Sequence, residues 1–86
     1  IHNGKMMHFR PKNDVYTYFR YDKNSSIMVI LNISEKNQKI DLKRFEERIG
    51  NNKIFYDVFK NKNVEIHDYL EVSSKTPIIL TFQTPK

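Results

Sequence analysis

Few residues of this sequence have the types and spacing that metal or cofactor chemistry requires. The three histidines, His2, His8 and His67, lie far apart, and no two of them have the i, i+4 spacing of a helical zinc site. The chain contains no cysteine, so thiolate ligands and disulfide bonds are absent as well. The sequence therefore predicts no metal site and no cofactor.

The acidic residues also lack the pattern of a catalytic site. Hydrolysis of a glycosidic bond needs two carboxylates about 5–10 Å apart across a cleft. The aspartates fall mostly at turn or cap positions, where Asp bonds local backbone groups: Asp14, Asp22, Asp41, Asp57 and Asp68. Glu46 and Glu47 are neighbours on an expected helix and face apart. Nothing in this pattern marks a buried carboxylate pair.

Motifs for nucleophilic attack and phosphate binding are missing too. No serine lies in a G-x-S-x-G context, and the two glycines, Gly4 and Gly50, are too few and too far apart to form a phosphate-binding loop. We therefore expect no catalytic residue in this chain.

Aromatic and basic residues alternate in one segment, Tyr16–Tyr21, in a way that could bind a ligand or partner. The period of a strand puts Tyr16, Tyr18 and Arg20 on one face. Such rings can stack on bases or sugars, but tyrosine also suits half-buried strands, and Tyr and Arg are enriched in interfaces. Arg20 is either a plain surface arginine or one that binds a carboxylate or carbonyl groups of a neighbouring domain. The candidate site is an inter-domain interface made by these three residues, with a plain surface role for Arg20 as the alternative.

Length, charge and hydrophobicity indicate how many domains the chain forms and which kinds of partner it lacks the pattern for. The 86 residues suffice for one domain with a modest core, to which five Tyr and six Phe contribute. The net charge is +5, but basic and acidic residues are interleaved from Lys5 to Lys86, which argues against a nucleic-acid or membrane-binding arm. No apolar run reaches about 18 residues, and no signal peptide is visible. Because the chain begins with Ile1, we expect a piece of a longer protein.

Short segments rich in Val, Ile, Tyr and Phe alternate with Asn-rich turn signals, which is typical of an antiparallel all-β sandwich or barrel. The segment Ser26–Ile33 is apolar on both faces and is therefore expected to be a central strand with Leu31 buried. The predicted strands are Lys5–Arg10, Val15–Tyr21, Ser26–Ile33, Ile54–Phe59, Val64–Ile66, Tyr69–Val72 and Ile78–Phe82.

One short helix is predicted near residues 42–49. Asp41 is a suitable N-cap, the apolar residues Leu42, Phe45 and Ile49 follow at helical spacing, and Gly50 stands where a helix-ending glycine belongs. Two helical turns are too few to be stable alone, so we expect this apolar stripe, with Phe45 buried, to pack on the sheet. The fold class is thus an all-β, Greek-key-like antiparallel sandwich with one short helix. The ends, Ile1–Gly4 and Thr84–Lys86, are expected to be frayed.

Several short motifs follow one another over nearly the whole chain. Gly4–Tyr21 combines a strand ending in Phe-x-Pro, an Asn-Asp turn, Val-Tyr and an aromatic-Arg pair. Ile27–Asn32 is a hydrophobic strand ending in Asn, Leu42–Glu47 is Leu-x-x-Phe-x-Glu, and Asp57-Val58 follows the next strand. This ordered set resembles the C-terminal domain of cyclomaltodextrinases and neopullulanases in the alpha-amylase family of glycoside hydrolases. The chain departs from that pattern at Asn61, where the family has glycine, and before the closing strand, which lacks the usual glycine and has Ser74, Lys75 and Pro77.

The resemblance implies that residues 1–86 are one accessory C-terminal domain, excised from a larger enzyme that hydrolyses α-glucosidic bonds in maltodextrin, cyclodextrin, pullulan or starch. The catalytic carboxylates of that family lie on its (β/α)-barrel and none maps onto this chain, so we expect no activity from the chain alone. The implied partner is the catalytic barrel of the same parent chain, with α-glucan as a further ligand, and neither nucleic acid nor membrane is expected. The compartment stays open between the periplasm and the cytoplasm of a bacterium.

Two other classes of function remain as alternatives. One is a free-standing carbohydrate-binding module that uses exposed Tyr and Phe, and the other is a basic domain that binds single-stranded nucleic acid. Exposure of the rings separates them: a flat row of solvent-facing rings favours sugar, rings beside clustered Lys and Arg favour nucleic acid, and buried rings favour the accessory role.

Overall fold

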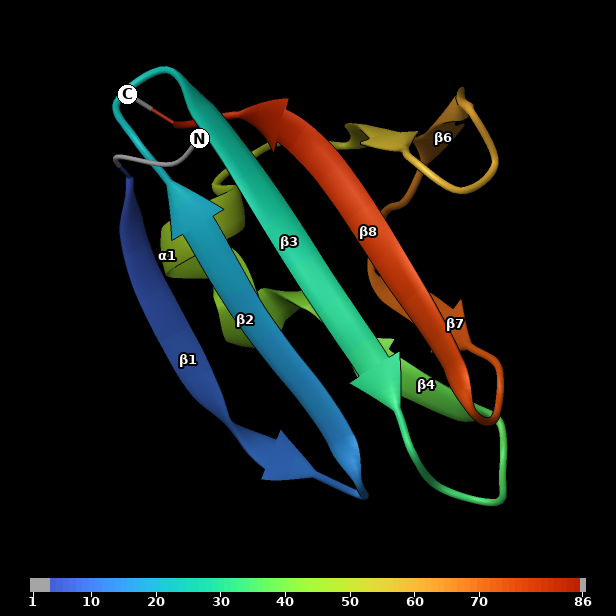
Figure 1. Ribbon diagram of the computed structural model, residues 1–86. Helices are drawn as coiled ribbons and strands as arrows, with labels where there is room; N and C mark the ends of the chain where they lie inside the picture. The colour runs from blue at the N-terminus through green and yellow to red at the C-terminus, as the bar shows by residue number, and fades with distance from the viewer. Residues whose placement is uncertain (1–3, 86) are drawn as a thin grey trace.

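The computed structural model describes residues 4–85 and shows two packed layers (Figure 1). The first layer is a six-stranded antiparallel sheet in the order β1-β2-β3-β8-β5-β6, and the second consists of a two-stranded sheet, β4-β7, and a short helical segment. The strands are β1 (Lys5–Lys12), β2 (Val15–Tyr21), β3 (Ser25–Asn32), β4 (Gln38–Asp41), β5 (Ile54–Asp57), β6 (Lys62–Glu65), β7 (Tyr69–Val72) and β8 (Thr76–Gln83). The predicted antiparallel all-β sandwich with one short helix is confirmed.

Tight turns join the first three strands into a meander. Asn13 and Asp14 connect β1 to β2 with positive φ angles of 54° and 63°, as a two-residue hairpin loop requires. Between β2 and β3, the Asp22 carboxylate accepts hydrogen bonds from the backbone N–H groups of Asn24 (2.7 Å) and Ser25 (2.8 Å). These two bonds, that of Ser25 foremost, lower the pKa of Asp22 below its usual value.

The core lies between the inner face of the large sheet and the second layer. Its largest side chains are phenylalanines whose rings contact one another in edge-to-face and tilted pairs, among them Phe19, Phe45, Phe55 and Phe82. Val15, Thr17 and Phe19 point inward from β2, so the alternation predicted for this strand is confirmed. The inward-facing rings hold the sheet and the helix together.

The helical segment covers this core as predicted, with η1 (Leu42–Phe45) forming a 3₁₀ turn and α1 (Glu46–Ile49) an α-helical turn. The Asp41 carboxylate caps it by accepting from the Lys43 backbone N–H at 2.9 Å. Gly50 ends it with φ 62°, and a Cβ there would lie only 2.7 Å from a carbon of Pro85. Phe45 is fully buried, as the sequence predicted.

The prediction for Leu31 is wrong. Strand β3 is central, as expected, but its inner face is made by Ser26, Met28, Ile30 and Asn32, and Leu31 is 39% exposed on the opposite face. Because both faces of β3 are apolar, the sequence pattern could not tell which one meets the helix.

Element boundaries also differ from the predictions. The strand predicted over Ile54–Phe59 ends at Asp57, because the carboxylate of Asp57 accepts from the Lys60 N–H at 3.0 Å and turns the chain. Strand β4 was not predicted, since its sequence Gln-Lys-Ile-Asp has little β propensity.

The C-terminal end is more ordered than expected. Thr84 is not frayed, because its hydroxyl donates to the Asp22 carbonyl at 2.7 Å. His2 and the rest of the tails, residues 1–3 and 86, lie outside the described part of the chain.

Candidate interaction surface

The three predicted interface residues lie together on the outer face of the large sheet, which faces away from the helix and from β4-β7 (Figure 1). Tyr16 is 46% exposed, and the half-buried ring of Tyr18 lies 5.4 Å from that of His8 on the neighbouring strand. Arg20 is exposed and lies opposite Met6 of β1 and Ile27 of β3. The structure thus brings the three side chains to one surface.

The same surface continues across β3, β8 and β5, where we predicted no interface residues. The strand register places Tyr16 in one row with Leu31 and Pro77, and Tyr18 in the next row with Val29 and Ile79. A third row consists of Arg20, Ile27, Thr81 and Tyr56. The outer face is therefore a broad apolar surface, of the kind that marks interaction sites in soluble proteins. The apolar character of both faces of β3 was the sequence signal for it.

The four long strands of the large sheet carry basic but no acidic residues, although the two charges are interleaved in the sequence. Strands β1, β2, β3 and β8 contain Lys5, Arg10, Lys12 and Arg20 but no acidic residue. All ten acidic residues lie in turns, in the smaller strands or in the helical segment. Within residues 4–85, Lys75 forms an ion pair with Glu35 and the His67 imidazole contacts the Glu65 carboxylate, and Arg20 takes part in neither contact.

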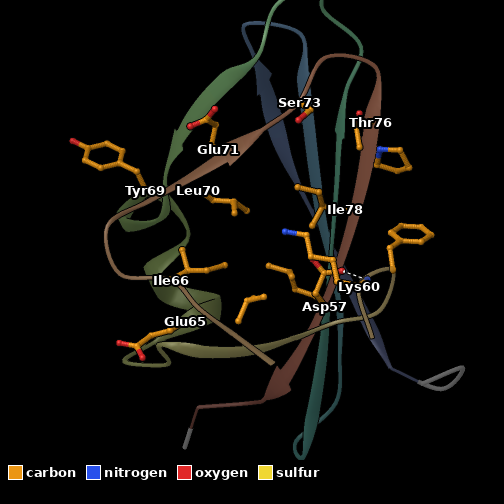
Figure 2. A pocket seen from close by; sticks show the side chains of 14 residues that line it. Asp57, Lys60, Glu65, Ile66, Tyr69, Leu70, Glu71, Ser73, Thr76 and Ile78 are labelled. Atoms are coloured by element: carbon orange, nitrogen blue, oxygen red, sulfur yellow. Dashed lines mark hydrogen bonds between the residues drawn. The ribbon is translucent and has the colours of Figure 1, made fainter. Parts of the chain in front are cut away.

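A second feature is a cleft of about 450 Å³ between the two layers (Figure 2). Ile66, Leu70 and Ile78 point into it, whereas Glu65 and Tyr69 point away. The cleft forms because β5 pairs with β8 only at Tyr56 and Asp57, which leaves the other end of β8 unpaired on that side.

The side chains that point into the cleft are aliphatic, and charged and hydroxyl-bearing residues such as Lys60, Glu71 and Thr76 also line it. The Asp57 carboxylate serves the turn at Lys60, and that of Glu65 lies 2.5 Å from the His67 imidazole. Pro77 stands on the unpaired stretch of β8 and has no N–H to offer an added strand, which protects this edge. The cleft is an opening in the core between the layers and not an assembly of catalytic groups.

The described histidines have local partners. His8 Nε2 lies 3.0 Å from the Met6 sulfur, and His67 pairs with Glu65. Across residues 4–85 no three His, Cys, Asp or Glu side chains are grouped to hold a metal ion. Over the same residues, no helix has the length and hydrophobicity that crossing a bilayer requires.

A family model described as "Cyclo-malto-dextrinase C-terminal domain" matches residues 6–81, nearly the whole chain. The chain belongs to this family. It is therefore a C-terminal domain of the cyclo-malto-dextrinase type, as the motifs had indicated. Among solved structures, it is similar to an Anoxybacillus alpha-amylase, with a TM-score of 0.74 and 16% sequence identity. That match covers 96% of this chain and 18% of the alpha-amylase chain, and at this identity it supports the fold alone.

The family motifs of this cyclo-malto-dextrinase C-terminal domain mostly serve its fold. Asn32, at the end of the hydrophobic strand, is fully buried, and its side-chain amide donates to the carbonyls of Lys36 (2.9 Å) and Val72 (3.1 Å). Phe45 fills the core and Asp57 caps a turn. The motif residues that face outward from the large sheet include Tyr16, Tyr18 and Arg20, with Val29 and Leu31 beside them on β3.

Proposed function

We propose that this domain is the accessory C-terminal part of an enzyme that hydrolyses α-glucan, such as maltodextrin, cyclodextrin, pullulan or starch. It does not catalyse by itself, and it stabilises the catalytic barrel of the same chain by docking on it with the outer face of its sheet, where Tyr16, Tyr18 and Arg20 lie. The observation that carries the proposal is the apolar outer face, which has no covering layer within residues 4–85. Each Å² of apolar surface removed from water contributes about 25 cal/mol, so covering this face favours docking.

The distribution of the rings supports docking over sugar or base recognition. Phe19, Phe45, Phe55 and Phe82 are buried in the core. Of the well-exposed rings, Tyr16 comes from β2, Tyr56 from β5, Phe59 from the β5–β6 turn and Tyr69 from β7 in the second layer, so they do not form one flat row. α-Glucan is a further ligand that single exposed rings such as Tyr56 could contact.

The isolated domain is expected to release no reducing sugar from cyclodextrin, pullulan or starch, because none of its carboxylates belongs to an acid–base pair set for hydrolysis. The measurement is a reducing-sugar assay on the purified 86-residue chain, with an active alpha-amylase as positive control. Activity that follows the protein peak through a second purification would contradict the proposal.

Replacing Arg20 by alanine is expected to cause a small loss of melting temperature in the isolated domain and a clearly larger loss in the parent enzyme. In the domain the side chain is exposed. When it is docked, its removal leaves a carboxylate or carbonyl of the barrel unpaired, which costs about 1–3 kcal/mol. The two proteins are compared by thermal unfolding at the same pH and salt. Equal losses would assign Arg20 to the fold of the domain and not to an interface.

A further inference from the structure

We infer that the docking surface extends from Tyr16 across β3 and β8 to the β5–β6 turn, where Phe59 is its anchor, and that it fits a surface of the catalytic domain that is apolar and bears carboxylates. The inference rests on the proposed function and adds the extent, the anchor and the chemistry of the partner surface.

Phe59 is the most exposed large hydrophobic side chain of the described residues, at 61%, and Val58 beside it is 43% exposed. The turn that carries them is fixed at three points. Val58 N–H donates to the Ile79 carbonyl (3.0 Å), Lys60 N–H to the Asp57 carboxylate (3.0 Å) and Asn61 N–H to the Asp57 carbonyl (2.8 Å). A ring on a rigid backbone loses little conformational freedom on binding, so its burial adds to affinity at low cost.

The turn adjoins the outer face, because the Val58 N–H donates to the carbonyl of Ile79, which pairs with Val29 in the row of Tyr18, and Phe59 also borders the cleft between the layers. The surface therefore has an apolar centre at Val29 and Ile79, the Phe59 anchor at one border and Arg20 near the other. This asymmetry sets one orientation for the partner.

Charge complementarity indicates which partner fits. On the four long strands Arg20 faces outward and no acidic residue is present, and the carboxylate of Glu65 lies at the distant β6 edge. A bound surface therefore gains attraction if it presents carboxylates near Arg20 and is repelled there if it is basic. A second copy of this chain fits less well, since two-fold pairing would bring two faces together whose long strands offer Arg20 but no carboxylate to pair with it. Nucleic acid fits poorly as well, because the centre is aliphatic and the basic residues lie at one border.

The test uses the full-length enzyme that carries this chain and the half-life of its thermal inactivation, which does not require two-state unfolding. Phe59→Ser is compared with Tyr69→Ser, since Tyr69 is similarly exposed (57%) but lies on β7 in the other layer. Arg20→Gln and Arg20→Glu are compared with Lys43→Glu, an exposed position on the helical segment. The same variants are melted in the isolated domain.

We expect Phe59→Ser to shorten the half-life of the enzyme about tenfold, Tyr69→Ser less than twofold, and neither to shift the melting temperature of the isolated domain appreciably. Arg20→Glu should shorten it more than Arg20→Gln, because a carboxylate of the variant would repel those of the partner, and Lys43→Glu should have little effect.

If deletion of the domain shortens the half-life of the enzyme, the proposed function stands, and two results would then overturn the inference. One is that Phe59→Ser shortens the half-life no more than Tyr69→Ser does. The other is that Arg20→Glu and Arg20→Gln shorten it equally. If deletion of the domain leaves the half-life unchanged, the proposed function itself fails. Self-association of the isolated domain that Phe59→Ser abolishes would assign the surface to a second copy and also overturn the inference.

Discussion

Truncating Phe45 to alanine is expected to lower the free energy of unfolding of the isolated domain by about 3–5 kcal/mol. Phe45 is fully buried, and its ring lies 4.8 Å from that of Phe9 and 5.8 Å from that of Phe19. It is the side chain by which the helical segment joins the aromatic core of the sheet. A domain of this size has a total stability of about 5–10 kcal/mol, so the variant should be close to unfolding.

Urea denaturation followed by circular dichroism measures this loss, with Phe59→Ala as the matched control. The control removes the same atoms from a ring that is 61% exposed, so its cost in the isolated domain should stay within about 0.5 kcal/mol. If Phe45→Ala and Phe59→Ala have the same midpoint, the packing of the helix on the sheet is not what stabilises the domain.

Strand β2 and the helical segment could be predicted because each carries one clear apolar face. In β2 the alternation of Val15, Thr17 and Phe19 with Tyr16 and Tyr18 leaves a single way to orient the strand. In the helical segment the spacing of Leu42, Phe45 and Ile49 puts the apolar side chains on one face, which can only be the face that packs on the sheet. For this reason the predicted interface residues on β2 were found together on one surface.

Strand β3 shows why the rest could not be predicted. Its two faces are almost equally apolar, and only the register with β2 and β8 decides that Met28 and Ile30 meet the helix whereas Leu31 faces outward. The same ambiguity hid the extent of the outer face. Leu31→Ala is consequently expected to affect the isolated domain less than a core truncation, because the side chain is already 39% exposed there.

The distribution of charge likewise depends on the fold. In the sequence, Arg20 is followed two residues later by Asp22, which suggests local compensation. In the structure the Asp22 carboxylate binds the backbone of its own turn, and Arg20 on the outer face has no acidic neighbours on β1, β2, β3 or β8. No window of the sequence shows this arrangement, because it arises from pairing strands that are up to about 60 residues apart.

Replacing Asn32 by aspartate is expected to destabilise the domain by about 3–5 kcal/mol at neutral pH, although the two side chains have nearly the same shape. The Asn32 amide donates to the carbonyls of Lys36 and Val72, and its carbonyl oxygen accepts from the Ser34 N–H (2.9 Å) and hydroxyl (2.6 Å). This one buried side chain thus ties the end of β3 to the following loop and to β7. A carboxylate keeps the accepted bonds but places a buried charge against two carbonyl oxygens.

Asn37→Asp is the matched control, since Asn37 is exposed and its side-chain oxygen accepts from the Ser74 N–H at 2.9 Å, a bond that a carboxylate retains. The effect of pH separates charge from shape. Burial should raise the pKa of a carboxyl group at position 32 in the folded state above its unfolded value of about 3.9. The proton then stabilises the folded variant at low pH, and this stability is lost as the pH rises through the folded pKa. The difference in unfolding free energy between Asn32→Asp and Asn37→Asp should therefore be smaller at pH 4 than at pH 7. A difference that does not change with pH would mean that the loss at Asn32 does not come from a buried charge.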